Sequence, residues 1–153
     1  MRISIVALFV CLPVLCTACD TFSGVSRTAS IAQLPHARIE QVLSRVPGVT
    51  SIRREHVPQS VAWSLYQGKV VSPAYDRYLY SAGEVGGVVE FRQRPEVGNE
   101  LEIYYWWFNR QMPARTADEA RRVMDAVYEA LRQEFPGIPE KSAVLETQMR
   151  LGP

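Results

Sequence analysis

Hydrophobic and polar residues alternate most clearly over residues 100–108, which read Glu-Leu-Glu-Ile-Tyr-Tyr-Trp-Trp-Phe. This segment is dense in strand-forming residues, so it predicts a β-strand. Successive side chains of a strand point to opposite faces. One face therefore carries Leu101, Ile103, Tyr105 and Trp107, and the other carries Glu102, Tyr104, Trp106 and Phe108. We expect this strand to be the central one of a sheet.

Further strands are predicted over residues 49–55, 61–66, 75–81 and 88–94, where strand-forming residues lie between turn signals. Residues 69–74 contain Ser72-Pro73 and are predicted to form a loop. Three glycines, Gly83, Gly86 and Gly87, indicate a turn before residue 88. Residues 95–99 have the length of a hairpin connection, so we expect strand 88–94 to pair antiparallel with strand 100–108.

Two amphipathic helices are predicted. The first begins near Pro35, ends at Pro47-Gly48 and has apolar residues at helical spacing: Ile39, Val42, Leu43 and Val46. The second follows Pro113, has a capping-box pattern in Thr116 and Glu119, and ends before Pro136-Gly137. Its apolar stripe consists of Ala120, Val123, Met124, Val127, Tyr128 and Leu131.

These elements predict an α+β fold, a two-layer sandwich in which a mainly antiparallel sheet of about 4–5 strands carries two helices on one face. Residues 142–151 favour an edge strand that returns to this sheet, with a short helix as the alternative. Both helices run into Pro-Gly and then a strand. This repetition indicates either two uses of a common helix stop or a pseudo-symmetric sandwich.

The helix–Pro-Gly–strand pattern of residues 39–52, and in part of residues 128–145, is similar to ferredoxin-like domains, including small heavy-metal-binding ones. Metal-binding members carry a C-x-x-C loop before the first helix. This chain has Ile-Ala-Gln-Leu-Pro-His at residues 31–36 instead. The resemblance therefore implies a fold and not a metal site, and we predict neither metal nor cofactor.

The N-terminus has the features of an export signal. Arg2 precedes an apolar run over residues 3–15 that is too short to span a membrane. The run closes on Leu15-Cys16-Thr17-Ala18-Cys19, which resembles the lipobox of bacterial lipoproteins, although Cys16 stands where leucine is usual. The resemblance implies a signal peptide over residues 1–18 and acylation of Cys19, palmitate included, as the mature N-terminus. A plain secretory signal is the alternative.

Lipidation at Cys19 implies an anchored protein of the bacterial cell envelope that faces the periplasm. Asp20 resembles an inner-membrane retention signal, and the outer membrane remains the alternative. Residues 19–33 are mostly small and polar, so we expect a lipidated N-terminus followed by a flexible tether. Residues 34–153 are then expected to form a single globular domain.

The charge composition restricts the classes of partner that the chain is expected to bind. The formal net charge is +1, and because Arg2 is the only charged residue before Cys19, the rest of the chain carries 16 basic and 16 acidic residues. This balance argues against nucleic acid as a partner. Cys16 and Cys19 have C-x-x-C spacing, but they lie in the processing segment, so we do not assign them to redox or metal chemistry.

No catalytic motif is recognisable in the sequence. Of the two histidines, His36 is expected in a first helical turn, and His56 follows Arg53-Arg54-Glu55. His56 is a candidate general base. Neighbouring residues of a strand point to opposite faces, so Glu55 is poorly placed to orient it. A small periplasmic enzyme of hydrolase type, with a loop-built site near His56, is therefore the alternative function.

The favoured function is a noncatalytic binding module. If Leu101 and Ile103 face the helices, the opposite row faces away from them and lies beside a neighbouring arginine. The candidate binding surface consists of Tyr104, Trp106, Phe108 and Arg92. Such aromatic surfaces suit a protein, glycan or lipid partner, in addition to the membrane itself. The competing interpretation is that the tether, residues 61–66 or a second copy of the chain covers this row.

Overall fold

The computed structural model describes residues 20–35, 38–64, 68–94, 98–108 and 112–151. The predicted signal peptide, residues 1–18, and the predicted lipidation site, Cys19, lie outside these ranges, as does His36. The elements in chain order are β1 (Asp20–Ser30), α1 (Ile39–Leu43), β2 (Val49–Val57), β3 (Ser60–Ser64), β4 (Gly68–Ser72), β5 (Tyr75–Ala82), β6 (Val85–Arg94), β7 (Gly98–Phe108), α2 (Ala114–Glu134) and β8 (Ala143–Leu151).

The fold is α+β, as predicted, with a six-stranded sheet in the order β2-β5-β6-β7-β1-β8. Every neighbouring pair in this sheet is antiparallel. Strands β3 and β4 form a separate two-stranded sheet, here called the arm. The sheet has more strands than the sequence predicted, because β1 joins it. Strand β4 forms where a loop was expected, and it lies in the arm.

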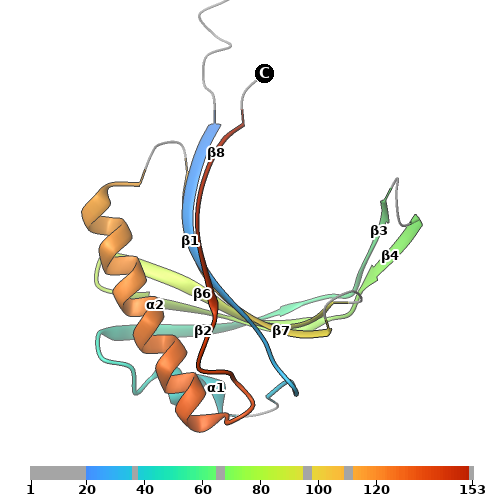
Figure 1. Ribbon diagram of the computed structural model, residues 1–153, viewed down its shortest axis with the longest axis horizontal. Helices are drawn as coiled ribbons and strands as arrows, with labels where there is room; N and C mark the ends of the chain where they lie inside the picture. The colour runs from blue at the N-terminus through green and yellow to red at the C-terminus, as the bar shows by residue number, and fades with distance from the viewer. Residues whose placement is uncertain (1–19, 36–37, 65–67, 95–97, 109–111, 152–153) are drawn as a thin grey trace, which may run out of the picture.

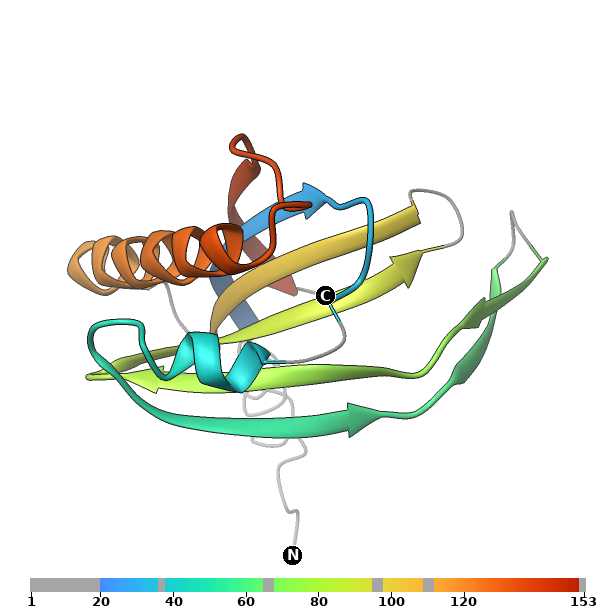
Figure 2. The same ribbon diagram turned by 90° about the horizontal axis from the view of Figure 1, so that it is seen from below.

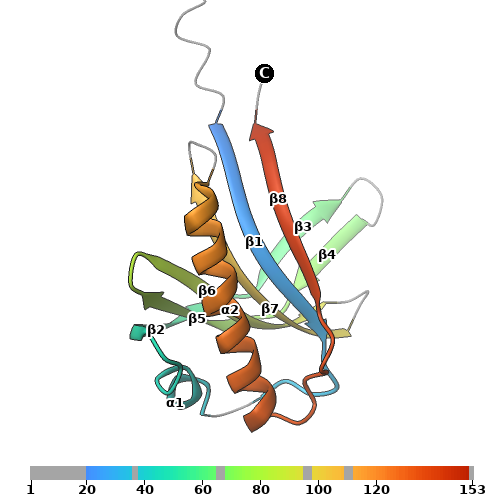
Figure 3. The ribbon, with the colours of Figure 1, turned by 60° about the vertical axis from the view of Figure 1, so that its left-hand side comes forward.

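The sheet is strongly curved (Figure 1). Strands β1 and β8 rise on one side and the arm rises on the other, so the face turned away from the helices is concave. Seen from below, the helices lie toward one end of the molecule and the arm lies at the opposite end (Figure 2). In a third view β1 and β8 run side by side next to α2 (Figure 3).

The core lies between the helices and the convex face of the sheet. The predicted stripe of α2, from Ala120 to Leu131, is buried at all six positions. Leu101 and Ile103 of β7 are 0% exposed, and Tyr105 and Trp107 pack against the same core at partial burial. The predicted assignment of faces along this strand is therefore correct. The predicted hairpin is also confirmed, with Phe91 of β6 opposite Leu101.

Strand β1 overturns the prediction of a flexible tether over residues 19–33. It pairs with β7 on one side and β8 on the other. Val25 and Ala29 are buried on the helix side. The hydroxyl of Ser23 accepts a hydrogen bond from the backbone N–H of Met112 at 2.8 Å, so this small polar residue is satisfied while buried. A composition that resembles a linker thus forms an interior strand.

The glycine-rich turn is also shorter than predicted. Gly83 has a positive φ of 61° and lies in the turn, whereas Gly86 and Gly87 belong to β6. Tyr80 lies directly opposite Gly87, and a β-carbon at Gly87 would meet the Tyr80 ring. Gly87 therefore serves a close approach between strands, and the chain does not need it for a turn.

The helix ends differ from the predicted pattern. Helix α1 begins at Ile39, later than Pro35 suggested, although Val46 beyond its end is still buried. Helix α2 begins at Ala114 without a side-chain cap, so Thr116 lies inside the helix and the predicted capping box does not form. The Glu119 carboxylate instead accepts hydrogen bonds from Arg122, one turn further along, at 2.6 and 3.2 Å.

After each helix the chain enters an edge strand of the same sheet, although the two routes differ. Strand β2 starts directly after Gly48, whose φ is +88°. After α2, buried Ile138 precedes a longer connection to β8. The prediction of an edge strand near the C-terminus is confirmed, and β2 and β8 form the two opposite edges.

Replacing Leu131, which is 0% exposed, tests the core. We expect Leu131→Ala to lower the free energy of unfolding by about 2–5 kcal/mol, through lost burial and the cavity left behind. The matched control is Leu145→Ala, because Leu145 is 61% exposed; a change within about 0.5 kcal/mol is expected there. Urea unfolding of the two variants measures the difference, and equal effects would contradict this core assignment.

Candidate functional site

The candidate site lies on the open face, which we define as the sheet face turned away from both helices. The pairing register fixes its composition. Leu79 of β5 lies opposite Val88 of β6, and Val88 lies opposite Tyr104 of β7. Because Val89 and Ile103 point to the core, these three side chains point away from it. Trp106 shares the open face with Tyr104.

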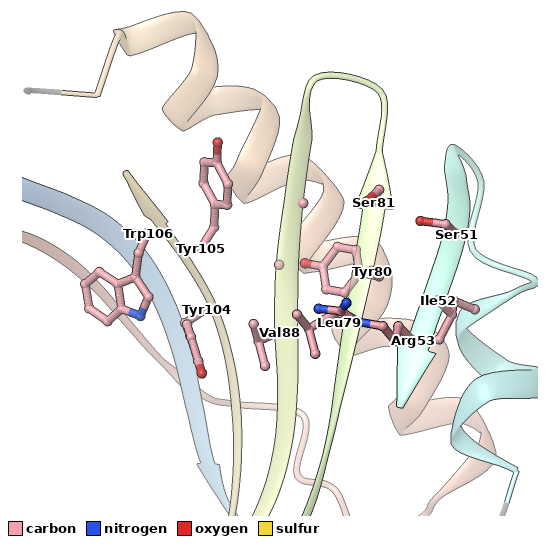
Figure 4. Close-up of a pocket in the computed structure, with 12 residues that line it drawn as sticks. Ser51, Ile52, Arg53, Leu79, Tyr80, Ser81, Val88, Tyr104, Tyr105 and Trp106 are labelled. Atoms are coloured by element: carbon pink, nitrogen blue, oxygen red, sulfur yellow. The ribbon is translucent and has the colours of Figure 1, made fainter. Parts of the chain in front are cut away.

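A hollow of about 620 Å³ occupies one half of the open face. Figure 4 shows its lining, which runs from Trp106 and Tyr104 on β7 across Val88 and Leu79 to Arg53 on β2. The lining is mainly apolar. One of its polar members is Ser81, which follows Leu79 by two residues near the end of β5. Hollows of this size with a few polar groups at the margin are typical of small-ligand sites.

Two of the aromatic rings that line the hollow lie close together. The ring centroids of Tyr104 and Trp106 are 5.8 Å apart, and the rings are tilted by 46°. Trp106 also lies over β1, where its partner in the register is Gly24. A β-carbon at Gly24 would meet the six-membered ring of Trp106. The absence of a side chain at Gly24 therefore makes room for the indole.

The other half of the open face is charged, and its centre is a buried carboxylate. Glu90 is 2% exposed although it lies on the face turned away from α1 and α2. The hydroxyls of Tyr104 and Tyr75 donate to its Oε1 at 2.9 and 3.4 Å, and Arg92 Nε lies 3.2 Å from its Oε2. Burial, followed by the negative charge of Glu90, raises the pKa of Tyr104 above its ordinary value. Tyr104 therefore remains a neutral donor.

Ion pairs continue across this charged half. Arg92 also pairs with Glu102, and Arg94 pairs with Glu100. Arg77 Nε donates to Glu55 Oε2 at 2.8 Å. The charges on this half are thus neutralised within the protein, and they lie beside the hollow.

The structure divides the predicted binding surface. Tyr104 and Trp106 line the hollow and are partly buried, with β1 beside them in the sheet. Arg92 lies in the charged half, with its guanidinium carbon 5.9 Å from the centroid of the Tyr75 ring. The side chain of Phe108 lies outside the described part of the molecule. Leu79, Val88 and Gly24 belong to the site but were missed, since only the strand register brings them together.

His56 lies on the opposite face of edge strand β2 and has a carboxylate partner that sequence adjacency did not indicate. Its Nδ1 is 3.0 Å from Asp76 Oδ1, and the two residues are directly opposite in the register. Asp76 also accepts a hydrogen bond from Arg54 at 2.5 Å. Hydrogen bonds from Arg54 and then His56 hold the pKa of Asp76 below its ordinary value. Glu55 points the other way, toward Arg77.

The described ranges show neither a metal-binding cluster nor a membrane-spanning helix. In these ranges no three His, Cys, Asp or Glu side chains gather as a metal ion would require. None of the helices described is long and apolar enough to cross a bilayer. The sequence matches no family model, no curated protein and no solved structure.

Adding a methyl group at Gly24 tests the contact that shapes the hollow. We expect Gly24→Ala to displace the Trp106 ring, to shift tryptophan fluorescence and to cost about 1–3 kcal/mol of stability through overpacking. The matched control is Gly137→Ala, because a β-carbon at Gly137 meets nothing within 4 Å.

A double-mutant cycle isolates this contact. In a Trp106→Ala background the cost of Gly24→Ala should fall, because the ring that the methyl group meets is gone. An unchanged cost in that background would mean that the penalty arises from the strand itself and not from the indole.

Proposed function

We propose that this chain is a lipid-anchored protein of the bacterial envelope that faces the periplasm and binds a ligand or partner, without catalysis, on the open face. The lipobox-like residues that end at Cys19 support the anchor. The observation that carries the binding function is the hollow lined by Trp106 and Tyr104. Aromatic rings supply much of the contact area in binding sites, and partly exposed rings at a concave surface mark such sites.

The fixed geometry of the open face favours binding. Tyr104 is held by its hydrogen bond to Glu90, and Glu90 is held in turn by Arg92. Trp106 is seated over Gly24. Side chains that are already immobilised lose little conformational entropy when a ligand arrives, so less of the contact energy is spent on ordering them.

The pair of His56 and Asp76 supports the alternative, a small hydrolase-like enzyme. A histidine held by a carboxylate has the geometry of a general base. The side chain of His56, however, is 68% exposed on an edge strand, and Asp76 is shared with Arg54. The hollow lies on the other face of the sheet. Binding at the open face is therefore the function that the geometry favours.

The anchor is tested by Cys19→Ser. We expect this variant to leave the membrane fraction or to accumulate as an uncleaved precursor, because no thiol remains for acylation at that position. The control is Cys16→Ser, which should fractionate as the wild type does. Metabolic labelling with a fatty acid, followed by fractionation, measures both effects. Label that persists on the Cys19→Ser chain would refute the assignment.

The binding surface is tested by crosslinking in living cells. A photoreactive p-benzoylphenylalanine in place of Leu79 projects from the hollow's floor, and we expect it to form a specific adduct on illumination. The matched position is Arg122, whose side chain is 74% exposed on α2. Mass spectrometry of the adducts identifies the partner. If position 79 gives no adduct, or only the adducts that position 122 gives, the open face is not the binding surface.

A further inference from the structure

The hollow lies in the half of the open face that is nearer to the start of β1. Trp106 is opposite Gly24 and Tyr104 is opposite Ser26, whereas Glu102 and Glu100 of the charged half are opposite Thr28 and Ser30. Gly24 is four residues along the strand from Asp20, which is about 13 Å at the usual strand rise. Because Asp20 directly follows Cys19, an anchor at Cys19 would hold the apolar half close to the bilayer.

The chemistry of the hollow is that of an apolar ligand. Leu79 and Val88 present aliphatic carbon, and four aromatic residues also line the hollow: Tyr80, Tyr104, Tyr105 and Trp106. The hydroxyl of Tyr104 is turned to Glu90 in the charged half, so the hollow receives its ring. A sugar or other polar ligand needs hydrogen-bonding groups to replace the water that it loses. The lining offers mainly carbon.

The arginines on the open face are paired with glutamates, so they contribute little to the recognition of a charged ligand. Arg53 at the margin of the hollow lies 2.7 Å from Glu55 Oε1. On the charged half, Arg77, Arg92 and Arg94 each have a glutamate partner as well. Ion pairs formed within the protein leave only a weak field to attract a charged ligand. Recognition in the hollow therefore depends on burial of apolar surface.

We propose that the hollow binds an acyl chain of a membrane lipid. This inference rests on the proposed function, because it names the ligand of the same open face and uses the anchor at Cys19. The bilayer that holds the protein is the source of the chain. The start of β1 and the arm rise at opposite ends of the curved sheet, both from its concave side, so the concave face lies between them (Figure 1).

The test uses the full chain with Cys19→Ser, which carries no lipid at that position, and cis-parinaric acid, a fatty acid that fluoresces in apolar surroundings. Saturable binding is expected. Val88→Arg places a charge in the hollow and should raise the Kd at least tenfold. Val144→Arg makes the same substitution at a valine that is 48% exposed on β8, and should leave the Kd unchanged.

A second variant covers the case in which Val88→Arg disturbs folding. Ser81→Trp fills the hollow without adding charge, and Ser81 is exposed, so the fold tolerates the larger side chain. Circular dichroism checks each variant. A Ser81→Trp chain that is folded and binds at least tenfold more weakly supports the proposal. Unchanged affinity in both folded variants, or no parinaric acid binding at all, overturns it.

Competition identifies the source of the chain. Short-chain phosphatidylglycerol, added as a monomer, should displace parinaric acid from the Cys19→Ser chain. If the wild-type lipidated protein does not bind parinaric acid but the Cys19→Ser chain does, the protein's own lipid fills the hollow, and the assignment to a membrane lipid is wrong.

The crosslinking experiment separates the two proposals. If parinaric acid does not bind but position 79 still captures a partner in cells, the lipid inference fails and the proposed binding function stands. If position 79 captures nothing and parinaric acid does not bind, both fail.

Discussion

The pairing of β1 with its two neighbours is the interaction on which the rest of the structure depends. In the described part of the chain, strand β8 lies at the end of the strand order and joins the sheet through β1. Strand β7 would otherwise be an edge, with its backbone donors and acceptors open to other chains. Val25 adds a fully buried side chain to the core, and Gly24 seats the indole of Trp106. Sheet, core and hollow therefore all depend on the N-terminal segment.

This constraint also changes how an anchored chain would sit at a membrane. A flexible tether would let the domain move freely above the bilayer. Here the segment after Cys19 is a strand from Asp20 onward, and Arg27 within it is held by Asp125 at 3.0 Å and by the face of the Tyr128 ring at 4.4 Å. Lipidation at Cys19 would couple the orientation of the whole sheet to the membrane surface. The apolar half of the open face would then have a defined height above the lipid.

Strong periodicity made β7 and α2 predictable from sequence, because each packs one row or stripe of apolar side chains against the core. Strand β1 was not predictable in this way. Its helix-side face holds Ser23 and Arg27 as well as Val25 and Ala29, and the polar members contact Met112, Asp125 and Tyr128, which are distant in sequence. The glycines also show that local sequence does not reveal contacts between strands. A turn at Gly83 follows from local conformation, but Gly87 is explained only by Tyr80 on the neighbouring strand.

Only the part of the site that lies on a single strand was predictable from the sequence. Alternation along β7 alone put Tyr104 and Trp106 together, whereas Leu79 and Val88 depend on the registers of two further pairings. Arg92 was assigned to the aromatic row because it is a neighbour in the sheet, but Glu90 and Glu102 bind it.

The ion pair between Glu90 and Arg92 also affects the composition of the hollow. By binding both Arg92 and the Tyr104 hydroxyl, the buried Glu90 holds these polar groups in one half of the open face, and the other half is mainly carbon. Removing one partner would leave Glu90 buried and undersatisfied, so the separation of the two halves is enforced by the cost of an unpaired charge.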